Sequence, residues 1–271
     1  MGDLDRVVEE TRHWGYSADG FAEQYERYRP RPPSALLDLL PLLVGLERPE
    51  LVVDLGSGTG LSTRFWAERA DAAIGIEPNP EMLAVAVAAT TAANVSYRIA
   101  SAEETGLTAG TADIVTCSQS LQWMEPKPTL AEVARILRPG GVFAAYEYRS
   151  CITRSAEANA AFEAAHARKG RLRAELGLDA GHARWPFGRE SLAESGRFRH
   201  VAETVLHSVE DVNAERLVGF FLSEGSTTTL LASGVGEDEV GIDVLRAAAR
   251  SGLGDVPSSW HLGYGLVLGW P

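Results

Sequence analysis

Several residue types are scarce in this chain of 271 residues, and each scarcity excludes a class of protein. The sequence has only two cysteines, Cys117 and Cys151, and they show neither metal-ligand nor redox spacing. We therefore expect no disulfide framework and no zinc site, and a reducing cytoplasm is the simplest location. The six histidines include no pair four residues apart, so no metal site is predicted.

Positive charge and long apolar runs are also in short supply. The chain has 25 Lys and Arg against 37 Asp and Glu, a net charge of −12. No basic run interrupts that balance, so a nucleic-acid backbone would be repelled and no nucleic-acid partner is expected. The longest apolar run is too short for a bilayer, and residues 1–15 are charged rather than signal-like, so no membrane partner is expected either. The oligomeric state stays open.

The most informative stretch that is present runs from Leu51 to Gly60. An apolar strand over 51–55 reaches Asp54 and a loop with glycines at 56, 58 and 60, and a helix is predicted over 60–70. Such a loop lets a ligand approach the backbone N–H groups at a helix start. A dinucleotide fingerprint would need a small residue where Leu61 stands, so the spacing argues against that ligand.

A second carboxylate ends the next predicted strand, over 72–77. Glu77 at the strand tip is placed to accept hydrogen bonds from a ribose diol. The alternative is that Glu77 only caps the helix predicted over 80–93, since an acid near a helix N-terminus is favourable in itself. The glycine loop upstream favours the ribose role.

Strand and helix patterns alternate along the middle of the chain, which predicts an α/β fold with a parallel sheet and right-handed crossovers. Two or three helices are predicted over 213–251, with breaks at Gly225 and Gly234. We predict one domain over 1–271. Its core comprises 35–150, 188–209 and 260–271, and a cap is formed by 1–34, 151–187 and 210–259. Further strands are expected at 95–100, 112–117, 141–147, 200–209 and 261–270, and further helices at 128–137 and 188–196.

The Asp-Leu-Gly-Ser-Gly-Thr-Gly motif at 54–60 resembles motif I of class I S-adenosylmethionine (SAM)-dependent methyltransferases. A Tyr and Arg-Pro before the first apolar helix, Gln122-Trp123 after the fourth strand, and the stretch 134–141 resemble the type 11 group, including small-molecule enzymes like trans-aconitate methyltransferase. The likeness is specific over 51–147 and extends to 152–270 only in layout. It implies a doubly wound, Rossmann-like sheet of seven strands, the last antiparallel, with a discontinuous helical cap.

The resemblance also implies the cofactor SAM, the product S-adenosylhomocysteine (SAH) and a small-molecule partner. Arg29 would pair with the SAM carboxylate, or else lie in solvent beside Glu26. Ser101 would meet the adenine where relatives have an acid, or form a capping box with Glu104. The full set of predicted cofactor residues is Tyr25, Arg29, Asp54, Gly56, Ser57, Gly58, Gly60, Glu77, Pro78, Met82, Ser101, Ala102, Glu103 and Ser118.

The catalytic candidates are Gln119, Gln122 and Trp123, which offer N–H donors but no strong base. Donors of this kind suit an acceptor that is already anionic, so O-methylation of a carboxylate is the favoured chemistry. The alternatives are core packing for Trp123, and methylation of a phenol, amine or carbon with His166 or His182 as base. A SAM-binding protein that transfers no methyl group, such as a regulator or a cyclase, would carry the same cofactor motifs.

Overall fold

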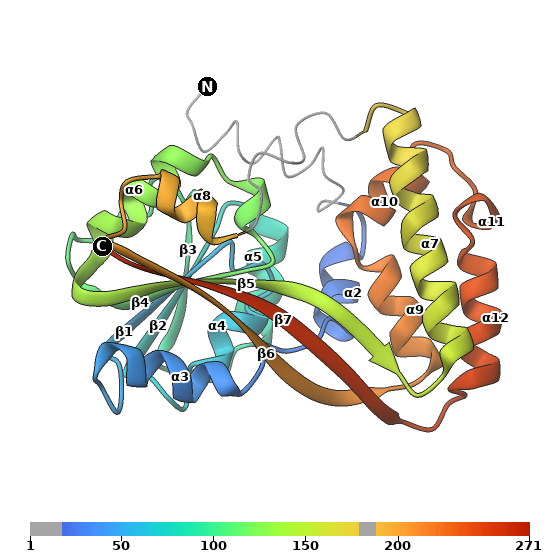
Figure 1. Ribbon diagram of the computed structural model, residues 1–271, viewed down its shortest axis with the longest axis horizontal. Coiled ribbons are helices and arrows are strands. Elements are labelled where there is room, and N and C mark those ends of the chain that lie inside the picture. The colour runs from blue at the N-terminus through green and yellow to red at the C-terminus, as the bar shows by residue number, and fades with distance from the viewer. Residues whose placement is uncertain (1–17, 179–187) are drawn as a thin grey trace.

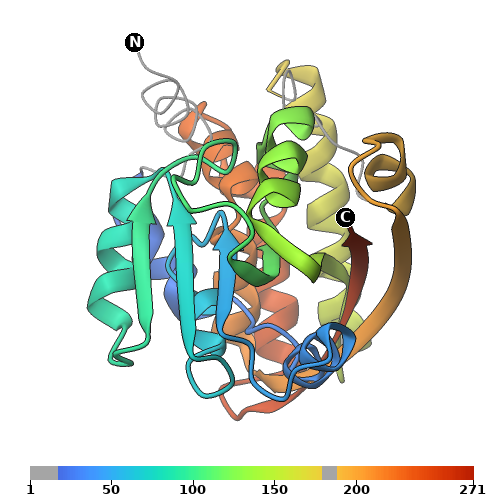
Figure 2. The ribbon, with the colours of Figure 1, turned by 90° about the vertical axis from the view of Figure 1, so that its left-hand side faces the viewer.

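The computed structural model describes residues 18–178 and 188–271. Seven strands form one sheet in the order β3-β2-β1-β4-β5-β7-β6. Strands β1 to β5 are parallel, and β7 is antiparallel to both of its neighbours, as predicted. In Figure 2 the arrows of β1, β2 and β3 point the same way. The strands are β1 (Leu51–Leu55), β2 (Ala72–Glu77), β3 (Val95–Ile99), β4 (Ala112–Ser118), β5 (Leu137–Thr153), β6 (His200–Val212) and β7 (Ser258–Trp270).

Helices lie on both faces of the sheet and in a separate group beyond its end (Figure 1). Those on the sheet are α3 (Ala35–Val44), α4 (Leu61–Phe65), α5 (Pro80–Ala89), the 3-10 turn η1 (Leu121–Trp123), α6 (Pro126–Ile136) and α8 (Arg189–Glu194). The separate group is α2 (Phe21–Tyr28), α7 (Ala156–Glu175), α9 (Ala214–Leu222), α10 (Gly225–Ala232), α11 (Glu237–Val240) and α12 (Ile242–Gly252).

Alternation along β1 supplies both faces of the sheet with apolar side chains. Val52 belongs to the core shared with α3, and Val53 to the core beneath α6 and α8; both are fully buried. A strand buried on both faces reads as a continuous apolar run, which is the pattern that the sequence shows at 51–55. Asp54, which breaks this apolar run in β1, and Glu77, at the end of β2, are both buried and therefore need local partners.

Two helix predictions were wrong in detail. The helix after the glycine loop ends at Phe65 rather than near residue 70, because the N–H groups of Trp66 and Ala67 turn to carbonyls three residues back. Four helices, rather than two or three, fill 214–252, since Gly225 opens α10 and Gly241 (φ 87°) separates α11 from α12.

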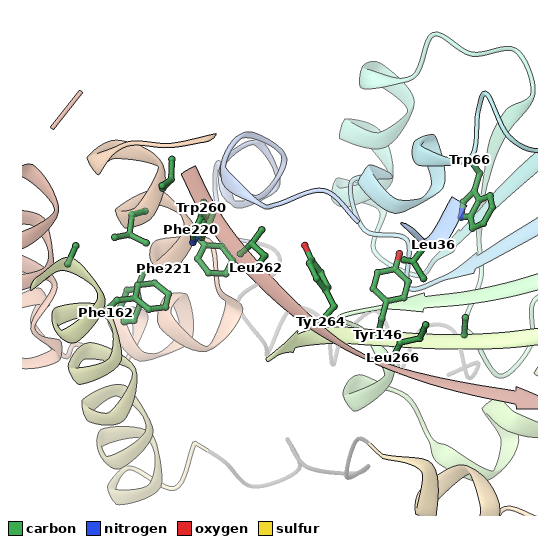
Figure 3. Close-up of a cluster of buried hydrophobic side chains, with 14 of the residues drawn as sticks. Leu36, Trp66, Tyr146, Phe162, Phe220, Phe221, Trp260, Leu262, Tyr264 and Leu266 are labelled. Atoms are coloured by element: carbon green, nitrogen blue, oxygen red, sulfur yellow. The ribbon is translucent and has the colours of Figure 1, made fainter. Parts of the chain in front are cut away.

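The strands β5, β7 and β6 are longer than the others and extend past the ends of β1 to β4. They connect the sheet to the separate group of helices, which we call the cap (Figure 1). Figure 3 shows the apolar core continuing into the cap, where Phe162, Phe221 and Trp260 gather. Tyr264 of β7 and Tyr146 of β5 continue this core from the cap towards Leu36 and Trp66 at its other end. Because one core spans both parts, the cap is fixed against the sheet rather than tethered to it.

A proline-rich strap, residues 29–33, connects α2 to α3 and is held at two carbonyls. Tyr148 of β5 donates its hydroxyl to Pro30 O at 3.3 Å, and Tyr264 of β7 donates to Arg31 O at 2.9 Å. The Arg31 N–H donates to Glu210 of β6 at 2.7 Å. Three neighbouring strands therefore fix the C-terminal end of α2.

Within residues 18–178 and 188–271, none of the helices combines the length and the apolar character that a membrane span requires.

Candidate active site

The glycine loop lies at the carboxyl ends of β1, β2 and β4, and two of its glycines are required by packing. Gly56 has φ 64°, and a Cβ there would lie 2.6 Å from Ser120 Cβ. At Gly60 (φ 80°) a Cβ would overlap the Tyr97 hydroxyl and approach Arg64. Gly58 differs, because a Cβ there would meet only the flexible end of Met82, at 3.3 Å. Gly58 is therefore the glycine most open to a ligand.

Glu77 holds the glycine loop rather than the helix that follows. One carboxylate oxygen accepts the Gly58 N–H and the other accepts the Asn79 N–H, both at 2.9 Å. Asn79 caps α5 by accepting from Glu81 N at 2.8 Å, so the capping alternative for Glu77 was wrong. A carboxylate has about four acceptor positions, which leaves two for a ribose diol. Burial raises the Glu77 pKa to about 7, although the two N–H donors act in the opposite direction.

Asp54 is a support for the site, with 1% of its surface exposed. Its carboxylate accepts from Thr63 and Thr116 hydroxyls at 2.8 Å and from Ser62 at 3.3 Å. Burial raises its pKa to about 6 against these hydrogen bonds. Ser62 also lies 2.6 Å from the Tyr146 hydroxyl. Asp54 thus ties the start of α4 to β4, and direct contact between Asp54 and a cofactor stays a prediction.

A small pocket of about 30 Å³ lies between the glycine loop and α2. Arg29 lines it and donates to Ser223 O at 3.0 Å, with its guanidinium 4.6 Å from the centre of the Tyr25 ring. Glu26 pairs instead with Arg64, so the alternative of a solvated Arg29 beside Glu26 was wrong. The pocket is lined by Tyr25, Arg29, Pro30, Pro32, Gly56, Ser57, Leu61, Ser62, Ser118, Gln119 and Tyr148.

The segment after β3 takes a form that the sequence did not predict. Ser101 is buried and the described residues 101–104 form no helix, so the capping-box alternative with Glu104 was wrong. Glu103 accepts from Glu125 N at 3.0 Å, at the start of α6. The segment lies next to Glu77, whose carbonyl accepts the Ala100 N–H at 3.4 Å. Adenine contacts from Ser101, Ala102 and Glu103 stay predictions, as does the contact predicted for Pro78.

A larger cavity of about 700 Å³ lies between the end of β4 and the cap, and we call it the acceptor cavity. All three catalytic candidates line it, so Trp123 is a wall residue rather than part of the core. Gln119 has a left-handed backbone, φ 55°, which is strained for a residue other than glycine. Its Nε2 is buried and has no hydrogen-bond partner among the described residues. Gln122 donates its own amide to Gln119 O at 2.8 Å.

The cap wall of this cavity holds a buried charged group that sequence reasoning missed. Lys169 of α7 pairs with Glu224, the residue before α10, and His166 Nε2 lies 3.5 Å from the same carboxylate. Burial lowers the His166 pKa to about 4, with Lys169 and Arg29 adding to the effect against Glu224. His182 lies outside the described residues. No sequence motif identifies Lys169 or Glu224, and the two residues come together only because α7 and α10 pack against each other.

The residues present fit the polar end of a SAM molecule. Ser57 Oγ lines the small pocket and is buried without a hydrogen-bond partner in the part of the chain that the structure describes. Buried polar atoms are normally satisfied, so this hydroxyl indicates a polar ligand. Arg29 offers a cation for its carboxylate, and Glu77 offers acceptors for its ribose. No group of three potential metal ligands occurs within 18–178 and 188–271.

A comparison with family models decides the assignment, because residues 53–145 match the methyltransferase domain family. The chain carries a class I SAM-dependent methyltransferase domain. An uncharacterized methyltransferase of Mycobacterium tuberculosis is 40% identical over 118 residues, 43% of this chain and 46% of that protein. A malonyl-[acyl-carrier protein] O-methyltransferase of Marinomonas is 32% identical over 127 residues, 45% of this chain and 47% of that protein. The chain therefore spans about half the length of these relatives.

A solved structure extends the likeness in fold to most of the chain. A protein proposed to be a type II methyltransferase from Anaeromyxobacter dehalogenans superimposes with a TM-score of 0.67. The match covers 90% of this chain and 98% of that one at 22% identity. The expected family and sheet are confirmed, and SAM is the cofactor of that family.

Proposed function

We propose that the protein transfers a methyl group from SAM to a carboxylate of a small molecule held in the acceptor cavity. The observation that carries the proposal is that the two hollows share walls: Tyr25, Arg29, Gln119 and Tyr148 line both of them. An acceptor in the larger hollow would therefore lie next to the polar end of a cofactor in the smaller one. We further propose that core and cap act as the single domain predicted from the sequence.

When the acceptor is already ionised, the protein does not have to remove a proton from it. SAM, when bound, supplies an electrophilic methyl group on a sulfonium. The chain's own contribution is then to align the acceptor oxygen and to exclude water, because methyl transfer of this kind depends on proximity and orientation. The unsatisfied amide of Gln119 can orient a carboxylate by donating a hydrogen bond, and Trp123 provides a flat wall and a second donor.

The proton balance favours a carboxylate over a phenol. His166 is the histidine of the described cavity wall, and its pKa is lowered to about 4. A phenol has a pKa near 10, so proton transfer to His166 would be strongly uphill. A carboxylate is ionised at neutral pH and avoids that cost. The Marinomonas relative is named for O-methylation of a malonyl group, which supports the same chemistry.

Methylation of a phenol, amine or carbon is the second candidate, and the place of His166 in the wall is what favours it. Incubation with SAM and separate carboxylate, phenol and amine panels, followed by measurement of SAH release, tests both. We expect release with carboxylates. Release with phenols alone, at a rate that rises through a pKa and disappears in His166→Ala, would contradict the carboxylate proposal. SAM binding without release from any panel would favour a protein that transfers no methyl group.

Cytoplasmic location, the absence of a nucleic-acid partner and a small-molecule acceptor stay predictions from the sequence. The first two rest on composition and charge, and the third on the family resemblance and on the aromatic and polar lining of the cavity.

A further inference from the structure

The far wall of the acceptor cavity, in the cap, contains a lysine that is almost wholly buried. Only 6% of the Lys169 surface is exposed, yet Lys169 is among the residues that line the cavity. Its ammonium pairs with Glu224 and lies 3.4 Å from the Thr227 hydroxyl. An ammonium has three N–H donors, and the next partner after these two is the Phe221 ring, centred 4.8 Å away, which an oxyanion could displace. Burying a charge in this way is expensive, and a buried ion pair is seldom gained for stability.

The charges around Lys169 favour an anion. Arg173 is buried behind the first turn of α10, donating to Ser226 O at 3.1 Å, and Arg29, which we assign to the cofactor carboxylate, lines the same cavity. Against these cations Glu224 is the buried carboxylate of the described cavity wall, and Glu163 lies on the exposed rim. The pKa of Glu224 responds to this surplus: burial raises it, but Lys169, His166 and Arg29 lower it below its ordinary value overall.

An aromatic section separates this wall from the catalytic candidates. Phe162 and Phe220 stack with ring centres 5.9 Å apart, and Tyr148 meets Phe220 edge-on at 5.5 Å. All three line the cavity, and their contacts run from α7, which carries Lys169, through α9 to β5, the neighbour of β4. A ligand that fills the cavity would therefore have a flat or apolar middle and a polar group at each end.

We infer that Lys169 binds a second oxyanion of the acceptor, a carboxylate or a phosphate, at the end opposite the carboxylate that is methylated. The inference rests on the proposed function and makes it narrower: the acceptor would be a dianion with an apolar or aromatic middle. Lys169 would act on specificity rather than on the chemical step, because it lies in the cap and Gln119 lies beside the cofactor pocket.

Calorimetry on the full chain with SAH present tests this with three probes. They are 3-phenylpropanoate, which has one anion, 3-(4-carboxyphenyl)propanoate, which has two carboxylates, and 3-(4-phosphonooxyphenyl)propanoate, which has a carboxylate and a phosphate. We expect the second anion to tighten binding by about tenfold or more, the gain of one hydrogen bond to a charged group. The stronger of the two dianions identifies the oxyanion.

The variant Lys169→Met should remove most of that gain and leave 3-phenylpropanoate binding within about twofold of the original. Because Lys169→Met leaves Glu224 without its ion-pair partner, Lys169→Met with Glu224→Gln provides a neutral second variant, and Lys169→Arg should restore the gain. Arg171→Met is the matched control, since it removes the same charge from the exposed face of α7.

The outcomes distinguish a failure of the role of Lys169 from a failure of the proposed function. A gain from the second anion that persists in both Lys169→Met variants, or no gain in the original protein, would overturn the role of Lys169 and leave the proposed function standing. If SAH binds but none of the three acids does, then the carboxylate acceptor is wrong and the inference is overturned with it.

Discussion

Arg64 and Glu26 form an ion pair that joins the glycine loop to the helix α2. The same Arg64 guanidinium donates to Thr59 O, within the loop, at 2.6 Å. Both side chains are largely shielded from water, with 18% and 25% of their surfaces exposed. Phe21 and Ala22, near the start of α2, pack against Met82 of α5. The Arg64 guanidinium therefore holds both the glycine loop and α2, the helix that covers the loop.

The first prediction is that Arg64 slows the release of the cofactor. Arg64→Met removes the link between α2 and the loop and should speed SAH dissociation about fivefold, the effect of losing roughly 1 kcal/mol. Stopped-flow displacement measures the rate. Arg27→Met is the control, because its pair with Glu215 also holds α2 but is exposed and distant from the loop. Equal rates in the two variants would refute the role of Arg64.

Hydrogen exchange provides a second measurement of the same helix. From the sequence we predict that residues 12–31 and part of 152–187 form a lid that becomes ordered when the cofactor binds, because methyl transfer works best in a closed site. Residues 12–17 and 179–187 lie outside the described part of the chain. For α2 we expect amides from Phe21 to Tyr28 to exchange more slowly when SAH is bound, since a closed site has to open for exchange. Unchanged exchange would mean that α2 does not open to admit the ligand.

Gly58 and Gly56 should fail in different ways when substituted. Gly58→Val places a branched side chain beside Met82 at a positive φ, so we expect SAM affinity to be lost at a folding cost of about 1–2 kcal/mol. Gly56→Val would collide with Ser120 and should unfold the loop itself. Calorimetry and thermal melts distinguish these results. Full SAM affinity in Gly58→Val would remove the loop from the cofactor site.

Glu77 should make cofactor affinity and protein stability respond to pH in opposite directions. Its pKa is about 7 in the folded chain, against about 4.3 for an unperturbed glutamate, so ionisation costs stability above pH 7. As pH falls from 7 towards 4, the free protein should gain up to roughly 3 kcal/mol from this group. SAH affinity should fall over the same range, because the ribose loses a charged acceptor. Glu77→Gln should flatten both trends, and a pH-independent affinity in the original protein would contradict the ribose role.

Gln119 offers a substitution that separates folding from chemistry. Gln119→Gly relieves the strained φ of 55° and should stabilise the fold by up to about 1 kcal/mol. The same change removes the amide that we assign to the acceptor, so the rate of methyl transfer should fall at least tenfold with cofactor affinity nearly unchanged. A variant as active as the original would exclude Gln119 from the acceptor site.

The pH dependence of the rate distinguishes the two candidate chemistries. With a carboxylate acceptor and saturating SAM, the rate should be flat above about pH 5, because no group of the protein has to lose a proton. Trp123→Phe should lower the plateau without changing the shape. A rate that rises with pH, and whose rise is lost in His166→Ala, would indicate histidine catalysis instead.

The sequence was a good guide where the chemistry is local. The strand at 51–55, the glycines after it and the carboxylate at Glu77 follow from short patterns, and all have the predicted places in the sheet. The sequence was a poor guide after the third strand. Ser101 and Glu104 satisfy a helix-capping pattern, yet no helix begins there. The pair of Lys169 and Glu224 could not be predicted, because 55 positions separate them and only helix packing brings them together.

The strap between α2 and α3 has a consequence for kinetic order. Tyr148 and Tyr264 fix Pro30 and Arg31, so any swing of α2 pivots at that end. The residues just before the pivot, Tyr25 and Arg29, form walls of both hollows. We therefore expect a compulsory sequence in which SAM enters first and the returning helix completes the place for the second substrate. The methylated product would then leave before the spent cofactor.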